Sequence, residues 1–187
     1  MKRCVATVSF AISALFLWPG CGEDSSKTEE HTVVDTTKST PPDTTYVMNT
    51  FVSDAAEGGM MEVELSKLAQ SNGASEDVKE FGKMLETDHA AANAELRSIA
   101  AAGNIPLPAR MSEEHSKHVK AMGEMKGADF DKHFITMMVE DHDKDVAAFK
   151  DAAANNPNQQ VKDFAAKTLP TLQKHLDKAK AIKSKMK

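Results

Sequence analysis

Apolar residues recur every three or four positions along most of the chain after residue 49, which is the spacing of amphipathic helices. One stripe runs through Phe51, Ala55, Gly58, Glu62, Leu65 and Ala69, and Asn72-Gly73 follows it as a C-terminal stop. A second stripe runs through Val78, Phe81, Leu85, Ala92 and Ile99. Ser75 stands at its N-cap position and Gly103 ends it. The pattern predicts a helical hairpin that folds at Gly73.

A second pair of stripes follows a weakly patterned connection. Pro106 and Pro108 exclude helix interior there, and Ser112 is placed to cap a short helix that reaches Gly127. The next long helix is predicted to begin at Asp129 and to end at Asn155-Asn156-Pro157, with a stripe through Phe130, Phe134, Met138, Ala148, Phe149 and Ala152. The last stripe runs through Val161, Ala165, Thr168, Leu172, Ala179 and Ile182, and Pro170 is expected to kink that helix.

Two helical hairpins joined by roughly 25 residues predict an all-α fold, a ferritin-like four-helix bundle whose long crossover contains a short extra helix. A simple up-down bundle is the alternative. The crossover would make the helices at 75–103 and 129–155 parallel, with both starting at one end. His89 lies 14 residues after Ser75 and His142 lies 13 after Asp129, so their levels would agree within about 1.5 Å.

The residues before this domain have the pattern of an export signal. Lys2 and Arg3 precede an uncharged, mostly apolar run at 4–18 that is too short to span a bilayer. Gly20-Cys21 resembles the processing site of bacterial lipoproteins, at which the cysteine is lipidated and becomes the new N-terminus. We therefore expect a signal at 1–20 and a lipid anchor at Cys21 in the cell envelope. The alternative is cleavage after Gly22 and a secreted soluble protein.

Composition separates a tether from the bundle and limits the partners. Residues 22–48 are rich in Ser, Thr, Asp, Glu and Pro, which predicts a disordered tether at 21–48 ahead of a bundle domain at 49–187. Loss of Lys2 and Arg3 with the signal leaves 21 basic against 28 acidic residues. That balance argues against nucleic acid or anionic lipid as the main partner, so the N-terminal lipid is the expected membrane contact.

Three histidines, His89, His142 and His175, each interrupt the apolar stripe of a long helix. Burying such groups costs several kcal/mol unless they are paired or bind a metal. Folding the first hairpin at Gly73 puts Glu57 level with His89, and Glu62 lies about 7 to 8 Å away along the axis. Three imidazoles with Glu57 or Glu62 would suit Zn, Cu, Ni or non-haem Fe.

A polar core layer without a metal is the alternative for these histidines, with bonds to carboxylates and to the Ala166 carbonyl that Pro170 leaves free. Solvated placement is a third possibility. The aspartates next to the histidines, Asp88 and Asp141, are expected to face other directions unless helix rotation brings one of them inward.

The spacing around the histidines argues against a standard di-iron oxidase. Such sites repeat Glu-x-x-His on two helices. Glu86 and His89 have this spacing, which makes Glu86 a further candidate ligand. Glu140, however, lies only two residues before His142, and Leu172 occupies the position three before His175.

Several short motifs occur along the chain in a specific order. They are the run Ala55–Ala69, Asp88-His89, Phe130-Asp131, Asp141-His142, and Leu169-Pro170-Thr171-Leu172 with His175. Over about Thr50 to Ala179 this set closely resembles the bacterial envelope family called domain of unknown function 4142. The resemblance implies a ferritin-like bundle in an exported, often lipid-anchored protein. It carries no implication about a metal.

Two classes of function remain. The chain lacks a Gly-rich phosphate loop, a Ser/His/Asp set and a cysteine nucleophile, so hydrolase or transferase chemistry is not expected. The first class is a non-catalytic envelope lipoprotein that acts through interaction or stress protection. The second is a metal-binding or metal-dependent redox protein that uses the histidines.

Overall fold

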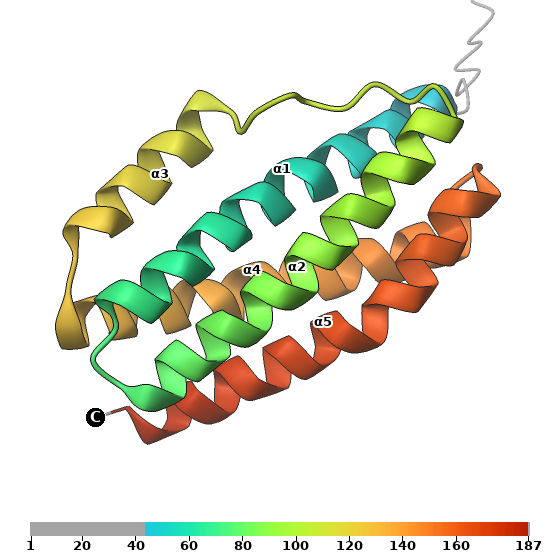
Figure 1. Cartoon of the computed structure of the whole chain (residues 1–187). Helices are drawn as coiled ribbons and strands as arrows, with labels where there is room; N and C mark the ends of the chain where they lie inside the picture. Colours follow the sequence, from blue (N-terminus) through green and yellow to red (C-terminus); the bar gives the residue numbers. More distant parts are fainter. Residues whose placement is uncertain (1–43, 187) are drawn as a thin grey trace, which may run out of the picture. The chain divides into compact units, whose positions relative to one another are not determined.

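The computed structural model describes the backbone of residues 44–186 and the side chains of residues 50–186. It contains helices α1 (Thr44–Asn72), α2 (Glu76–Ala102), α3 (Glu113–Glu124), α4 (Gly127–Asn155) and α5 (Gln159–Lys185) (Figure 1). The expected signal at 1–20, Cys21 and most of the tether at 21–48 lie outside the described residues. The all-α class is confirmed, and α3 is the short extra helix of the crossover.

The four long helices close into a ring. The two hairpins pair α1 with α2 and α4 with α5, while α2 also packs on α5 and α1 on α4. Helix α3 lies outside this ring against α1, where Figure 1 shows it in yellow beyond the blue-green helix. The connection therefore runs back along the bundle, which confirms the ferritin-like arrangement with a long crossover.

Polar contacts lock the end of the crossover onto the turn of the first hairpin. Gly73 and Gly127 form an isolated parallel bridge. Asp131, buried near the start of α4, accepts hydrogen bonds from the backbone amides of Ala74 at 3.0 Å and Ser75 at 2.8 Å. The Asn72 amide donates to the carbonyls of Gly123 and Met125. Helices α2 and α4 consequently start at the same end and run parallel.

Some helices begin at a different residue from the one expected from the sequence. Helix α1 begins at Thr44, before the expected 49. Ser75 is the N-cap residue of α2 as expected, but its hydroxyl makes no capping bond, and the Val78 amide bonds the Ser75 carbonyl instead. Ser112 caps α3 as predicted, accepting from the His115 amide at 3.3 Å. Helix α4 begins at Gly127, whose φ of 67° suits glycine, instead of at Asp129.

Two apolar clusters fill the bundle, one toward each end. The first includes Leu65, Phe81, Leu85, Phe130, Phe134 and Met138. The second includes Val52, Leu96, Phe149, Val161, Phe164 and Leu172. Between them lies a layer of buried polar side chains, Glu62, His89, His142 and His175, one from each long helix. Within residues 44–186, no helix combines the length and the apolar composition that crossing a bilayer requires.

Close packing of α1 on α2 at Gly82 generates a stability prediction. A Cβ at Gly82 would lie 2.7 Å from the Ala69 Cβ and 2.8 Å from the Ser66 carbonyl oxygen. Overpacking costs about 1 to 3 kcal/mol and exceeds the helix-propensity gain of about 1 kcal/mol. We expect Gly82→Ala to lower the free energy of unfolding by about 1 kcal/mol or more, as measured by urea denaturation.

Gly58 provides the matched control, because a Cβ there would meet nothing within 4 Å. Gly58→Ala should raise the free energy of unfolding by roughly 0.5 to 1 kcal/mol. Equal effects of the two substitutions would contradict the packing described at Gly82.

Candidate metal centre

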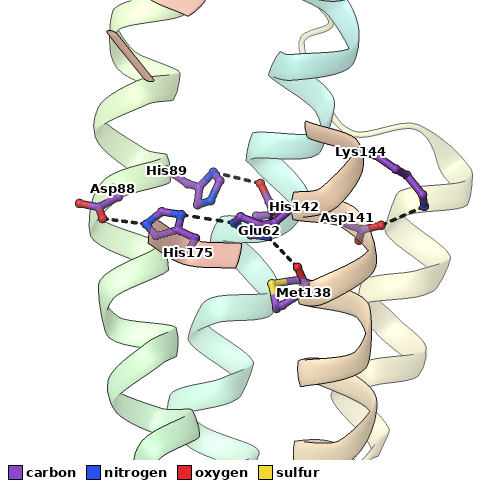
Figure 2. Close-up of polar contacts among 8 residues, drawn as sticks. All are labelled: Glu62, Asp88, His89, Met138, Asp141, His142, Lys144 and His175. Carbon is purple, nitrogen blue, oxygen red and sulfur yellow. Dashed lines mark hydrogen bonds and ion pairs between the residues drawn. The ribbon is translucent and has the colours of Figure 1, made fainter. Parts of the chain in front are cut away.

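The three histidines predicted from the sequence meet in the middle of the bundle. The ring centroids lie 5.5 Å apart for His89 and His142, and 5.3 Å apart for both His89–His175 and His142–His175. One ring nitrogen from each lies within 4.8 Å of the other two. All three side chains are buried, and Figure 2 shows them facing one another across the layer with Glu62 beside them. The parallel start of α2 and α4 brings His89 and His142 to one level.

The tautomers of two rings follow from their acceptors. His142 Nδ1 lies 3.0 Å from the Met138 carbonyl oxygen, which can only accept, so Nδ1 carries the proton. His175 Nε2 lies 2.9 Å from Asp88 Oδ2 and donates to that carboxylate. The second nitrogen of each neutral ring, Nε2 of His142 and Nδ1 of His175, therefore carries a lone pair.

These two lone-pair nitrogens face each other at 3.3 Å with no hydrogen between them (Figure 2). Two acceptors in contact inside a protein repel each other unless a cation lies between or beside them. Ligands held tetrahedrally about 2.0 to 2.1 Å from one ion are about 3.3 Å apart. The separation of His142 Nε2 and His175 Nδ1 therefore fits two ligands of a single tetrahedral metal ion.

His89 completes the set of three imidazoles, and Glu62 is its carboxylate partner. His89 Nδ1 lies 2.9 Å from Glu62 Oε2, and Glu62 Oε1 lies 3.5 Å from His142 Nδ1. His89 Nε2 and Glu62 Oε1 are both buried and have no hydrogen-bond partner among the described residues. A buried polar atom without a partner costs free energy, and a bound cation would supply the missing contact.

Burial sets the protonation of the layer. It lowers the pKa of His89, His142 and His175 to about 4 each, against the smaller raising effects of neighbouring carboxylates. It raises the pKa of Glu62 to about 7, although the nearby His142 acts in the opposite direction. At neutral pH the imidazoles are therefore neutral, which is the form that can bind a metal.

Asp88 is the aspartate that helix rotation brings toward the site. It faces the adjacent helix and holds His175 on α5. A carboxylate in this position fixes the tautomer of a metal-binding imidazole and raises its basicity. Asp141 does point elsewhere, toward Lys144 at 3.4 Å.

Two of the candidate carboxylates lie outside the histidine layer. Glu57 accepts from the Ser112 amide at 3.3 Å and lies 3.4 Å from His115 Nδ1, at the start of α3. Glu86 accepts from Gln70 Nε2 at 2.6 Å, between α1 and α2. The Glu-x-x-His spacing of Glu86 and His89 therefore does not put both side chains at one site.

Asp145 is a functional candidate that sequence reasoning missed. The charged run at 140–145 is typical of a solvated face, whereas Asp145 is partly buried and has one carboxylate oxygen within 4.8 Å of donor atoms of Glu62 and His142. Burial raises the pKa of Asp145 to about 7, and the adjacent Glu62 adds to that effect. The available signal was its position three residues after His142, which puts both on one helix face.

The raised pKa of Glu62 predicts a pH-dependent stability. A carboxyl group with a folded pKa of about 7 and an ordinary value of 4.5 contributes stability that is present below 4.5 and lost as the pH rises through 7. Glu62→Gln removes that loss. The unfolding free energy of Glu62→Gln minus that of the unsubstituted protein should therefore increase by roughly 2 kcal/mol from pH 5 to pH 8.5 in chelator-treated samples.

The control is Glu140→Gln, which changes an exposed carboxyl group on α4. Its unfolding free energy should differ from that of the unsubstituted protein by the same amount at both pH values. Urea unfolding at the two pH values measures the effect. A Glu62→Gln difference that does not change with pH would contradict the buried, protonatable carboxyl group described above.

Comparisons with known proteins agree with the helical fold. No curated protein sequence matches the chain. A solved DUF305 fragment from Deinococcus radiodurans is similar in fold, with 12% sequence identity, a TM-score of 0.63, and coverage of 74% of this chain and 95% of that chain. The family model named Domain of unknown function (DUF4142) matches residues 34–182. This chain therefore belongs to the DUF4142 family.

Proposed function

We propose that this protein binds a divalent transition-metal ion between His89, His142 and His175, with Glu62 as the carboxylate partner of His89. The observation that carries the proposal is the pair of lone-pair nitrogens, His142 Nε2 and His175 Nδ1, 3.3 Å apart in the buried layer. Their other nitrogens are already committed to Met138 and Asp88. A cation is the partner that satisfies both lone pairs together.

A metal ion suits this position better than a proton does. Burial holds the pKa of both imidazoles at about 4, so a proton is a poor occupant at neutral pH. Three imidazoles and a carboxylate favour Zn, Cu, Ni or Fe over Mg or Ca, which prefer oxygen ligands. The proposed cofactor is therefore a borderline metal.

The proposed role is metal handling without catalysis. The sequence offers no phosphate loop, Ser/His/Asp set or cysteine nucleophile to act on a substrate beside the ion. The carbonyl of Met138, the carboxylate of Asp88 and the carboxylate of Glu62 each orient one of the rings, as partners of structural metal ligands do. Of the two classes that the sequence left open, this proposal takes the metal-binding one, without redox chemistry.

We further propose that the bundle works in the cell envelope, anchored by a lipid on Cys21. The support is the short apolar segment at 4–18, followed by Gly20-Cys21 and the polar tether. A lipidated cysteine with more than one acyl chain gives stable anchoring. The tether would then hold the metal-binding domain clear of the membrane surface.

Metal binding predicts a specific thermal response. Zn²⁺ at about a hundredfold excess over its Kd should raise the melting temperature of chelator-treated protein by on the order of 8 °C. His142→Ala should abolish the rise. Differential scanning calorimetry measures it, and elemental analysis of protein purified without a nickel column identifies the resident metal.

His133→Ala is the matched control, because His133 is an exposed histidine on the same helix. It should retain the full response. Circular dichroism checks that both variants stay helical. A zinc response that survives in folded His142→Ala protein, or that is missing from the unsubstituted protein, would rule out this site.

The anchoring proposal is tested at the mature N-terminus. Mass spectrometry of protein from a bacterial membrane fraction should find Cys21 as the first residue, with a diacylglyceryl mass. Cys21→Ser should release the protein from that fraction. An unmodified N-terminus at Glu23 would instead establish cleavage after Gly22 and a soluble secreted protein.

A further inference from the structure

A cavity between α1, α3 and α4 leads to the histidine layer. Its volume is about 280 Å³, and Glu62 forms part of its wall. The same Glu62 side chain contacts His89 and His142 on the other side. The cavity therefore reaches Glu62, the side chain next to the proposed ligands.

The walls of this cavity are strongly acidic. Its carboxylates are Asp54, Glu57, Glu62, Asp141 and Asp145, and its basic residues are Lys144 and His115. Lys144 is mostly exposed and lies 3.4 Å from Asp141, and His115 lies beside Glu57. The excess of carboxylates in a low-dielectric recess concentrates cations and raises their association rate.

Three side chains that could bind a cation lie together at the inner end of the cavity. Glu62, His142 and Asp145 each place one donor atom within 4.8 Å of the others. The Glu62 side chain is only 5% exposed, and its Oε1 has no hydrogen-bond partner among the described residues. This buried oxygen is the independent sign of a ligand, because an unpartnered carboxylate oxygen is costly inside a protein.

We propose that Glu62 and Asp145, beside His142, form an outer cation site through which a hydrated divalent metal ion reaches the inner histidines. Glu62 belongs to both sites, with Oε2 next to His89 and Oε1 in the outer cluster. Two carboxylates bind and release such an ion faster than three imidazoles do. The inference rests on the proposed metal-binding function and adds a route to it.

The test follows Co²⁺ binding by stopped-flow absorbance, because the ion gains visible bands when it leaves octahedral water for a tetrahedral site. Asp145→Asn should slow the appearance of the bands by about tenfold or more while leaving the final spectrum unchanged. Asp145→Glu, which keeps the charge, should preserve most of the rate.

Asp143→Asn is the matched control. It removes the same charge from an exposed position on α4, where Asp143 pairs with Lys180 at 3.5 Å. Its rate should stay close to that of the unsubstituted protein. Equal rates for Asp143→Asn and Asp145→Asn would overturn the outer site.

The remaining outcomes separate the two proposals. A normal final spectrum with an unchanged rate in Asp145→Asn would overturn only the access route. A changed final spectrum in that variant would make Asp145 a ligand of the inner site and would also overturn the route. Absence of tetrahedral bands in the unsubstituted protein would overturn the proposed function itself, and the route with it.

Discussion

The exclusion of water from the middle of this bundle is the constraint on which the site depends. Each long helix contributes one ionisable side chain there, and apolar clusters lie above and below. Because solvent cannot satisfy these groups, the protein must do so, and it commits one nitrogen on each ring to an oxygen acceptor. The remaining nitrogens of His142 and His175 are then forced together as acceptors. The cost of that arrangement is what makes the layer a binding site instead of an ordinary polar contact.

The fold could be predicted largely from the spacing of apolar residues and from a few turn signals. The stops at Asn72-Gly73 and Asn155-Asn156-Pro157 end α1 and α4 as expected, and the crossover made α2 and α4 parallel. The starts of α1 and α4 were placed less accurately, whereas α2 begins after Ser75 as expected. The hydrogen bonds there could not be predicted, because Asp131, on a different helix, binds the backbone amides of Ala74 and Ser75.

The histidine positions could also be predicted, because interruptions of an apolar stripe point into the core. Their partners could not be predicted in the same way. Asp88 reaches His175 across a helix interface. Counting from Gly73 also put Glu57 level with His89, whereas Glu62 lies there, because Gly59 packs on Asn93 and the hairpin folds after Gly73. Depth depends on where the turn lies, and direction depends on the rotation of each helix about its axis. The partial burial of Asp145 is a further result of that rotation, since charge density alone indicated solvent.

The position of the three histidines on α2, α4 and α5 has a topological consequence. The sequence contains only two cysteines, both within its first 21 residues, so no disulfide can join the hairpins of the bundle. An ion bound by these histidines would cross-link both hairpins at mid-height and close the loop formed by the whole crossover. It would restrict the unfolded chain much as a disulfide does, yet could be removed by a chelator. The mechanical integrity of the domain would then follow the supply of metal.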